Sequence, residues 1–291
     1  MNRLERVLVT GAAGFIGRCV VNRLVDDGYL VRALVRRHCP LLPAGVEQTI
    51  VEDVAHVRWE QVLIGVNSIV HLAGIAHTRG VAESEYERVN VAPARALAQA
   101  ASSQRVVFMS SIRAADNSGQ EPCDAYGRSK RAAEQALLAL HPSACMLRPV
   151  PVYGFGARYN MRALELLARS RLPLPLGLLN APLSLVSVQN VASAVSFALR
   201  RELGGAFVLS DPGTSSLNAL LHDYRHALGR NALLINVPLP LLRSLTQMIG
   251  RETLFETLTQ SRLTPPQALL EAGWKPVHET TCAGVHDWAK R

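Results

Sequence analysis

The stretch that decides the fold is Arg6-Val-Leu-Val-Thr10-Gly11-Ala-Ala-Gly14-Phe-Ile-Gly17. Its first five residues are mainly apolar, as in a short buried strand, and a helical pattern follows the glycines. Gly11 permits a tight turn, Gly14 lets the backbone approach a pyrophosphate, and Gly17 lets the helix pack closely. Glycines at this spacing between a strand and a helix predict a dinucleotide site, with the phosphates at the helix N-terminus.

Beyond this stretch, apolar runs alternate with helical patterns as far as residue 149. We expect further strands at Leu30–Val35, Thr49–Val54, Val66–Gly74, 105–110 and Ala144–Pro149, and helices at Glu83–Ser102 and 125–140. Repeated strand–helix alternation is typical of the α/β class and predicts a doubly wound parallel sheet. Ligands bind such sheets at the carboxyl ends of the strands.

The end of the second strand bears on the choice of cofactor. An acidic residue at this place usually contacts the ribose of NAD(H), but here Arg36 and Arg37 follow Val35. Two guanidinium groups suit the 2′-phosphate of NADP(H), because each can form a fork of hydrogen bonds with phosphate oxygens. We therefore favour NADP(H). NAD(H) is the alternative, in which the two arginines are only a solvated strand end.

Two later strand ends carry further candidates. Asp53 closes the third strand, and its carboxylate could accept a hydrogen bond from the adenine amino group or could cap a helix. The fourth strand ends in small residues, which lets a cofactor lie against backbone. His71 in this strand is interpreted as a core histidine, whereas His77 lies just past the strand end and could contact a substrate.

Three residues suggest a proton-transfer site. Ser111 follows a buried strand, and Tyr126 and Lys130 are four residues apart, which places them on one helix face. A free tyrosine has a pKa of about 10, and a neighbouring ammonium group favours the phenolate and lowers that pKa. A serine hydroxyl can orient a substrate oxygen beside the phenol. With the dinucleotide turn, these groups predict coupled hydride and proton transfer.

Composition narrows the class of partner. Lys and Arg number 31 against 23 Asp and Glu, and aromatic residues make up 5% of the chain. This balance suits a small anionic ligand, and without a dominant basic block it does not support a nucleic-acid partner. The five cysteines form no C-x-x-C pair, which indicates a reducing compartment. Since a strand begins by residue 6, we expect no signal peptide and a cytoplasmic location.

Two patterns are weighed and set aside. Leu172–Leu199 carries no charged residue and is long enough to raise the question of a membrane span. Its prolines, Pro173, Pro175 and Pro182, interrupt any continuous helix, so we expect no stable membrane insertion. His222 and His226 have a spacing that can bind a metal, but no third ligand accompanies them. We interpret them as a solvated helix face and expect no metal site.

The regular alternation stops after about residue 150. We expect a dinucleotide-binding domain over residues 1–150, to which a segment at about 183–210 returns, and a smaller, mainly substrate-binding lobe over 151–291. Within these later segments we expect a helix at Arg158–Arg169 and strands at Leu183–Val188 and Ala206–Ser210.

Together these motifs resemble the extended short-chain dehydrogenase/reductase family, of the NAD-dependent epimerase/dehydratase type. The resemblance spans nearly the whole chain and rests on Thr10–Gly17, His71-Leu-Ala, Asn90-Val, Ser110-Ser111, Tyr126-Gly-Arg-Ser-Lys130, Arg148-Pro149, Val152-Tyr-Gly154 and Gly273-Trp274-Lys-Pro276. Within the family, the chain is most similar to bacterial UDP-sugar 4-epimerases and 4-ketoreductases.

The resemblance implies roles for the matching residues and a homodimer formed through the helices at 83–102 and 125–140. Tyr126 would be the acid/base, Lys130 would bind the nicotinamide ribose, and Ser111 would hold the reacting oxygen. Asn160 would meet the diphosphate of a nucleotide-sugar. The cofactor-binding residues would be Gly11, Gly14, Phe15, Ile16, Gly17, Arg36, Arg37, Asp53, Val54, Leu72, Ala73, Gly74, Asn90, Tyr126, Lys130, Pro149 and Val152.

Three departures from the family pattern leave the substrate open. The loop between Ser111 and Tyr126 is short and lacks the usual Val-Tyr-Gly after the serine. Asn180-Ala-Pro-Leu183 stands where the family often places arginines that meet a diphosphate. The second strand lacks the acidic residue of the NAD-retaining epimerases.

The leading hypothesis is an NADP(H)-dependent reductase that acts on a keto group of a nucleotide-sugar. One alternative is a UDP-sugar 4-epimerase with bound NAD. Others are a reductase of a less charged ketone or aldehyde, and a non-catalytic nucleotide sensor. The uncharged stretch from 172 to 199 also raises a lipid-linked sugar as substrate.

Overall fold

Contacts within the chain divide it into two units. The computed structural model describes residues 5–76, 80–115, 124–157, 159–248, 255, 259 and 261–291. Unit 1 comprises Met1–Pro149, Val191–Leu209 and Ala268–Trp274. Unit 2 comprises Val150–Asn190, Ser210–Gln267 and Lys275–Arg291. The returning segment expected at about 183–210 therefore begins at Val191, and a second returning segment follows near the C-terminus.

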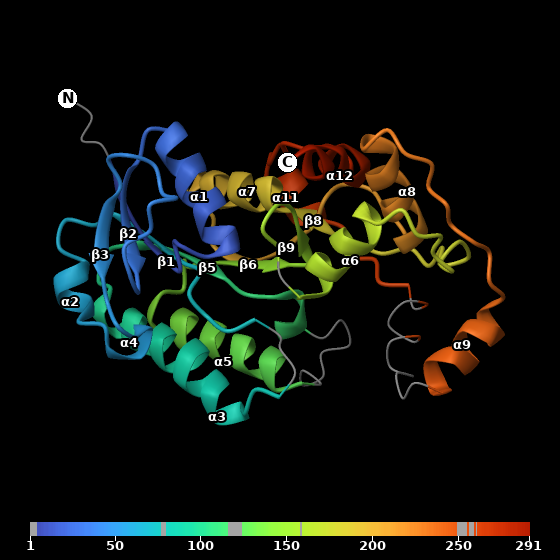
Figure 1. Ribbon diagram of the computed structural model, residues 1–291. Helices are drawn as coiled ribbons and strands as arrows, with labels where there is room; N and C mark the ends of the chain where they lie inside the picture. The colour runs from blue at the N-terminus through green and yellow to red at the C-terminus, as the bar shows by residue number, and fades with distance from the viewer. Residues whose placement is uncertain are drawn as a thin grey trace. The chain divides into compact units, whose positions relative to one another are not determined.

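Unit 1 is built, in the described part of the chain, on a parallel sheet of seven strands in the order β3-β2-β1-β4-β5-β6-β9 (Figure 1). The strands are β1 (Arg6–Thr10), β2 (Leu30–Val35), β3 (Glu47–Ile50), β4 (Ser68–His71), β5 (Arg105–Met109), β6 (Cys145–Pro149) and β9 (Gly205–Leu209). The strand order reverses between β1 and β4, which is where doubly wound sheets bind ligands. The predicted fold class is confirmed.

Helices cover both faces of this sheet. In Figure 1, α1 (Phe15–Asp26) and α7 (Val188–Arg201) lie on one face, and α4 (Ala92–Ala100) and α5 (Ala125–Leu140) lie on the other. Buried apolar side chains of α4, α5 and the sheet form a continuous core on that second face. The shorter helical segments of unit 1 are η1 (Val54–His56), α2 (Trp59–Val62), α3 (Glu83–Tyr86), η2 (Glu87–Val91), η3 (Ile112–Ala114) and α11 (Gln267–Glu271).

Unit 2 has a core of its own. Its described elements are the two-stranded parallel sheet of β7 (Val152–Tyr153) and β8 (Val186–Ser187), with α6 (Tyr159–Arg169), α8 (Leu217–Ala227), α9 (Leu239–Met248) and α12 (Thr281–Lys290). The ring of Trp288 lies 5.7 Å from the ring of Tyr153 and 5.0 Å from that of Tyr224. These three buried rings join β7, α8 and α12 into one hydrophobic cluster.

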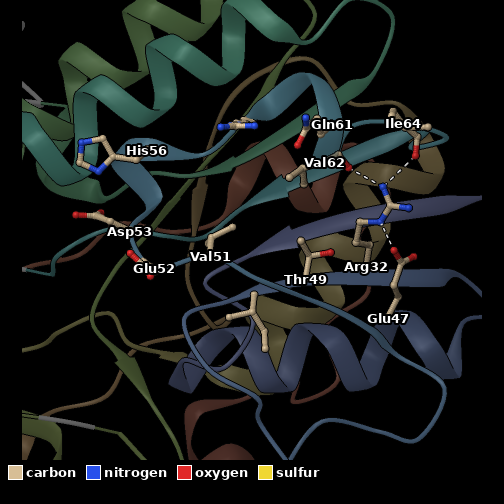
Figure 2. Close-up of a pocket in the computed structure, with 12 residues that line it drawn as sticks. Arg32, Glu47, Thr49, Val51, Glu52, Asp53, His56, Gln61, Val62 and Ile64 are labelled. Carbon is tan, nitrogen blue, oxygen red and sulfur yellow. Dashed lines mark hydrogen bonds and ion pairs between the residues drawn. The ribbon is translucent and has the colours of Figure 1, made fainter.

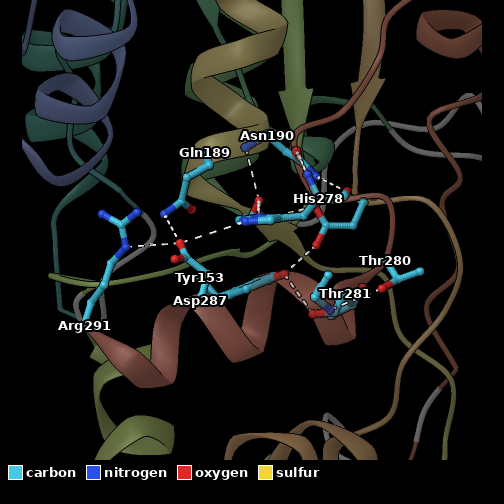
Figure 3. Close-up of polar contacts among 11 residues, drawn as sticks. Tyr153, Gln189, Asn190, His278, Thr280, Thr281, Asp287 and Arg291 are labelled. Carbon is cyan, nitrogen blue, oxygen red and sulfur yellow. Dashed lines mark hydrogen bonds and ion pairs between the residues drawn. The ribbon is translucent and has the colours of Figure 1, made fainter. Parts of the chain in front are cut away.

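A buried polar network lies beside this cluster (Figure 3). The hydroxyl of Tyr153 donates to Oδ2 of Asp211 at 2.7 Å, and Nδ2 of Asn190 donates to Oδ1 of Asp211 at 2.7 Å. Asn190 also donates to the carbonyl oxygen of His278 and accepts from its N–H, both at 2.9 Å. Because buried polar groups need partners, this network fixes four separate segments of unit 2 to one another.

Several expected elements differ in position or partner. The strand expected at Leu183–Val188 is only the two-residue β8, which pairs with β7 and not with the large sheet. The helix expected over Glu83–Ser102 is interrupted by a π-helical turn, η2. The third strand ends at Ile50, so Asp53 lies beyond it and begins η1.

The uncharged stretch Leu172–Leu199 forms irregular chain, β8 and most of α7. Within the described residues, no helix combines the length and the apolar character needed to cross a membrane.

Candidate active site

The glycine turn after β1 has the shape that a dinucleotide requires. Gly11 has a φ of 66°, and its carbonyl oxygen accepts a hydrogen bond from the N–H of Gly14 at 2.9 Å. A Cβ on Gly17 would lie 2.1 Å from that oxygen, and one on Gly11 would lie 2.9 Å from the nitrogen of Ala73, so neither position tolerates a side chain. Gly14 caps α1 and has no side chain to occupy the first N–H groups of the helix. The turn therefore fits a pyrophosphate.

A buried pair, Thr10 and His71, fixes the neighbouring strand end. Oγ1 of Thr10 accepts from the N–H groups of Leu72 at 3.1 Å and Ala73 at 3.0 Å, and it lies 2.9 Å from Nδ1 of His71. Since this oxygen already accepts two hydrogen bonds, its own proton points to Nδ1. Burial, with a smaller contribution from the charge of Lys130, lowers the pKa of His71 to about 3. The imidazole is therefore neutral, and its role is to hold the strand end in place.

Ser111 and Tyr126 meet at the carboxyl end of β5. Oγ of Ser111 accepts from the N–H of Arg113 at 3.2 Å, which caps η3, and the same side chain is hydrogen-bonded to Tyr126. Asp124 caps α5 by accepting from the N–H of Gly127 at 2.7 Å, so Tyr126 lies in the first turn of the helix. An ion pair between Arg113 and Asp124 links the two caps.

Burial raises the pKa of Tyr126 above its ordinary value. The hydrogen bond with Ser111 and the charge of Arg113 act in the opposite direction and are the smaller effects. Lys130 is not among the main causes of this shift, so the net lowering that the sequence predicts does not occur in this structure. A phenol with a raised pKa is protonated at neutral pH and can act as a proton donor.

Lys130 is buried one helical turn after Tyr126. Its Nζ donates to the carbonyl oxygen of Met109 at 2.9 Å and lies 4.9 Å from the centre of the Phe108 ring. Burial lowers the pKa of Lys130 to about 8, although the charge of Glu134 acts to raise it. At neutral pH most Lys130 side chains carry the proton, but this pKa lies only about one unit above pH 7.

Asn90 joins the loop after β4 to α5. Its Oδ1 accepts from the N–H of Ile75 at 2.7 Å, and its Nδ2 donates to Oγ of Ser129 at 3.0 Å. It lies in the π-helical turn η2, an irregularity often found at functional sites. A Cβ on Gly74 would lie 2.8 Å from Oδ1 of Asn90 and 3.3 Å from Nζ of Lys130, so all three residues converge. The bridge to Ser129 has no local sequence signal and was not predicted.

The remaining groups predicted in unit 1 lie near the ends of β2 and β3. Arg36 and Arg37 follow β2 with exposed side chains. Oδ1 of Asp53 accepts from the N–H of Ala55 at 3.0 Å, and its Oδ2 pairs with Arg88. These contacts, the hydrogen bond from Ala55 most of all, lower the pKa of Asp53. The helix-cap interpretation is confirmed, and the adenine contact stays a prediction.

A hollow of about 880 Å³ beside β3 is not lined by the candidate catalytic groups Ser111, Tyr126 and Lys130 (Figure 2). The guanidinium of Arg32 points into it and donates to Glu47 at 2.7 Å and to the carbonyl oxygens of Val62 and Ile64 at 2.7 and 2.9 Å. Of the predicted cofactor residues, only Asp53 lines this hollow. Since its central cation is already satisfied, we assign no ligand to it.

The other predicted residues fall on several elements. Phe15 and Ile16 form the first turn of α1, and Val54 begins η1. Pro149 ends β6 in unit 1, whereas Val152 begins β7 in unit 2. Asn160 is exposed at the start of α6, also in unit 2. His77 lies outside the described residues.

Arg262 is a candidate that the sequence did not indicate. Its N–H donates to the carbonyl oxygen of Pro182, and its own carbonyl oxygen accepts from the N–H of Ser184, both at 2.9 Å. The exposed Arg262 therefore stands beside the segment that the sequence showed to lack arginines. It comes from far along the chain, so no spacing rule could have found it.

The two histidines with metal-binding spacing lie together on α8. The rings of His222 and His226 stack with centres 6.2 Å apart, and both residues are exposed. In the part of the chain that the structure describes, no group of three His, Cys, Asp or Glu side chains is arranged to hold a metal ion.

Residues 7–209 match the sequence pattern of the NAD dependent epimerase/dehydratase family. The chain belongs to this family. It is accordingly an enzyme of the extended short-chain dehydrogenase/reductase type that uses a nicotinamide dinucleotide. The glycine turn and the Ser111, Tyr126 and Lys130 side chains lie within the matched residues.

Two relatives in the family are similar along most of their length. A ceramide reductase of Caulobacter vibrioides is 29% identical, over 96% of this chain and 88% of the relative. A UDP-glucose 4-epimerase of Vibrio cholerae is 28% identical, over 94% of this chain and 91% of the relative. Among solved structures, a UDP-N-acetylglucosamine 4-epimerase from Bacillus cereus has a TM-score of 0.77 at 20% identity, covering 99% of this chain and 100% of that one. At this identity the structural likeness bears on the fold alone.

Proposed function

We propose that this enzyme uses NADPH to reduce a keto group of a nucleotide-sugar. The observation that carries the proposal is the partly buried phenol of Tyr126, which has a raised pKa and a hydrogen bond with Ser111. Reduction needs a phenol that can give a proton to a carbonyl oxygen, whereas oxidation of an alcohol needs the phenolate. At neutral pH the phenol carries its proton, as the first role requires.

Each residue of the site has a part in this reaction. The hydroxyl of Ser111 donates a hydrogen bond to the carbonyl oxygen and holds it beside Tyr126. The phenol of Tyr126 gives its proton to that oxygen as the carbonyl carbon is reduced, and a proton from water restores the phenol. Lys130 would hold the ribose hydroxyls of the cofactor, and its charge would stabilise the negative charge that develops on the oxygen. The bound dihydronicotinamide supplies the hydride.

The choice of NADPH rests on the end of β2. Arg36 and Arg37 are exposed there, and no carboxylate follows Val35 before Glu47. A guanidinium group attracts the 2′-phosphate, and an acidic residue that would favour the free ribose hydroxyl is missing. The nucleotide-sugar is supported by the UDP-glucose 4-epimerase relative and by the exposed Arg262.

The test begins with the nucleotide that purified protein releases on denaturation, followed by titration with NADPH and NADH. We expect no retained NAD⁺ and tighter binding of NADPH. The double substitution Arg36→Ala and Arg37→Ala should weaken NADPH binding by about tenfold or more and leave NADH binding nearly unchanged. Tyr126→Phe should keep NADPH binding and lose at least about a hundredfold in turnover of a UDP-4-keto sugar. Tightly retained NAD⁺ would instead make epimerisation the function.

A second candidate is reduction of a ketone on an amphiphilic lipid. It is supported by the ceramide reductase relative and by Asn180–Leu183, which lacks arginines for a diphosphate. Parallel assays of NADPH oxidation, with a UDP-4-keto sugar and with a detergent-dispersed keto lipid, decide between the two. Turnover of the lipid alone would assign the second function.

A cytoplasmic location and a homodimer formed through the helices at 83–102 and 125–140 complete the proposal. Light scattering on the eluted peak of a gel-filtration column measures the oligomeric state directly, and a monomer would remove the dimer from the proposal.

A further inference from the structure

We propose that Arg18 is a third cation for the 2′-phosphate of NADPH and so helps to set the cofactor preference of this enzyme. Arg18 directly follows the glycine turn and is the fourth residue of α1. For this phosphate the sequence indicated Arg36 and Arg37 but not Arg18. The inference rests on the proposed use of NADPH, and it adds a specificity-determining residue to that site.

The guanidinium of Arg18 has no hydrogen-bond partner among the described residues. Its Nε is shielded from solvent. Within the described part of the chain, it is the only buried nitrogen of a side chain charged at neutral pH that lacks a partner. Because native proteins leave few such donors unpaired, this one indicates a site for a bound water or ligand.

The charges at this end of α1 favour an anion over a water molecule. The N-terminus of a helix carries a partial positive charge, which disfavours a cation there unless a negative group joins it. The first turn of α1 contains no acidic residue, and the capping Gly14 offers no side-chain acceptor. At the other end of the helix, by contrast, Arg23 donates to Asp27 at 2.8 Å. The anion that Arg18 needs must therefore come from a bound molecule.

Helical periodicity shows on which side of α1 the Arg18 side chain lies. Asp27 follows Arg18 by nine residues, about two and a half turns, so the two side chains leave opposite sides of the helix. Asp27 faces α7, where it pairs with Arg200 at 3.5 Å. α7 lies on the β5 side of α1, since the carbonyl oxygen of Leu199 in α7 accepts from Arg105 in β5. Arg18 therefore leaves α1 on the other side, which is that of β2 and β3 in the sheet order.

The register of the sheet brings Arg36 and Arg37 to the same place. β1 and β2 are parallel, and Thr10 pairs with Leu34. The glycine turn after β1 and the two arginines after β2 therefore leave neighbouring strands at nearly the same level. Arg36 and Arg37 are exposed, and neither guanidinium has a hydrogen-bond or ion-pair partner among the described residues. Three unpaired arginines thus lie around the carboxyl end of β2.

A phosphate monoester on the ribose is the anion that suits this arrangement. It carries close to two negative charges at neutral pH and has three acceptor oxygens, so it can bind more than one guanidinium. In doubly wound sheets the ribose of the adenosine half lies at the end of the second strand, whereas the pyrophosphate lies at the N–H groups of the helix. Because Arg18 leaves the helix on the side of β2, we assign it to the 2′-phosphate.

Binding titrations of NADPH and NADH with Arg18→Gln test the inference. NADPH binding should weaken by about tenfold or more, the loss of one charge-assisted contact, and NADH binding should change by less than about twofold. Adenosine 2′,5′-diphosphate, which carries the 2′-phosphate but no nicotinamide, should lose the same factor as NADPH. Arg18→Lys should lose a smaller factor, because lysine keeps the charge but not the fork of donors.

Arg23→Gln is the matched control, because it removes a cation from another side of the same helix. Its preference for NADPH over NADH should equal that of the unmodified protein. Thermal unfolding separates binding from folding. Without nucleotide, Arg18→Gln should unfold at the temperature of the unmodified protein, and saturating NADPH should raise that temperature by less in the variant.

Three results would overturn the inference. A preference for NADPH that Arg18→Gln leaves unchanged would remove Arg18 from the site and leave the proposed function intact. Equal weakening of NADPH and NADH would assign Arg18 to the pyrophosphate or to folding, and the unfolding temperature without nucleotide distinguishes these two roles. An unmodified protein that does not prefer NADPH would overturn the choice of cofactor in the proposed function, and the role of Arg18 with it.

Discussion

The ammonium group of Lys130 is confined to one buried position. It is buried between the carbonyl oxygen of Met109 and the ring of Phe108, and burial lowers its pKa to about 8. The group lies beside the strand end that carries Gly74, where a cofactor ribose is expected. A lysine with an ordinary pKa would keep its charge over the whole physiological range. Because the pKa of Lys130 is about 8, the positive charge that the proposed reaction needs is lost as the pH rises through mildly alkaline values.

A pH profile follows from this value. Below a pH of about 8 Lys130 carries its proton, and above it the ammonium form declines. We therefore expect kcat/KM for ketone reduction to be level near neutrality and to fall tenfold per pH unit once the pH passes the pKa. Stopped-flow or steady-state measurement of NADPH oxidation across this range checks the prediction.

Lys130→Arg is the control for this profile, because a guanidinium keeps its charge at every pH used. Whatever activity that variant retains should show no alkaline fall near pH 8. A fall that persists unchanged in Lys130→Arg would assign the titration to a different group.

At the scale of elements, unit 2 depends on Asp211. This buried carboxylate follows β9 and accepts from the hydroxyl of Tyr153 and from the side chain of Asn190. Burial raises the pKa of Asp211, while the hydrogen bonds act to lower it. Each donor would be left unsatisfied in a dry interior if the carboxylate were removed. The short strand β7 and the start of α7 are therefore fixed by one side chain.

Asp211→Ala should lower the free energy of unfolding by about 2–4 kcal/mol, because two or more buried donors lose their acceptor. Asp211→Asn should cost about 1 kcal/mol, since the amide oxygen can still accept at one position and the hydroxyl of Tyr153 can accept from the amide nitrogen. Urea unfolding monitored by tryptophan fluorescence reports the change, because Trp288 packs against Tyr153. Equal losses in the two variants would show that the network contributes no specific hydrogen-bond energy.

The elements also show what the sequence could and could not predict. The glycine turn and α5 are marked by local spacing, so Gly11, Tyr126 and Lys130 were placed on the right elements. The partner of β8 is a two-residue strand far along the chain, and no local pattern indicates that pairing. The burial of Arg225 and the bridge from Asn90 to Ser129 depend on tertiary contacts in the same way. Spacing therefore placed the candidate catalytic groups on their elements but did not indicate the contacts that position them.

The pKa of Tyr126 is a property that the sequence predicts in the wrong direction. The sequence places a cation four residues from the phenol and so predicts a lowered value. In the structure the ammonium donates to the main chain at Met109, and burial of the phenol is the larger effect. Sequence spacing shows which groups are near each other but not how much water each one loses on folding.

At the scale of the whole molecule, unit 1 is not a continuous stretch of chain. In the large sheet, β6 lies between β5 and β9. Between β6 and β9, the chain first forms residues 150–190 of unit 2. All five residues of β6, Cys145–Pro149, pair with Gly205–Leu209. A fragment that ends at Pro149 would expose an unpaired and apolar strand edge, which is a template for aggregation.

We therefore expect residues 1–149 expressed alone to be insoluble. The same fragment joined by a flexible linker to residues 191–209 should be recovered in the soluble fraction, because β9 and most of α7 are then restored. Fractionation and cooperative thermal unfolding measure the difference. A soluble and cooperatively folded fragment 1–149 would mean that the seventh strand is dispensable.

The interleaving of the two units has a consequence for protein engineering. The chain crosses between the units after Pro149, Asn190, Leu209, Gln267 and Trp274. A single genetic crossover could not exchange unit 2 for that of another family member without breaking unit 1 as well. To exchange unit 2, the chain would have to be cut and rejoined at several of these crossings at once. A designer who wishes to change unit 2 should therefore substitute side chains in place and not exchange the unit as a module.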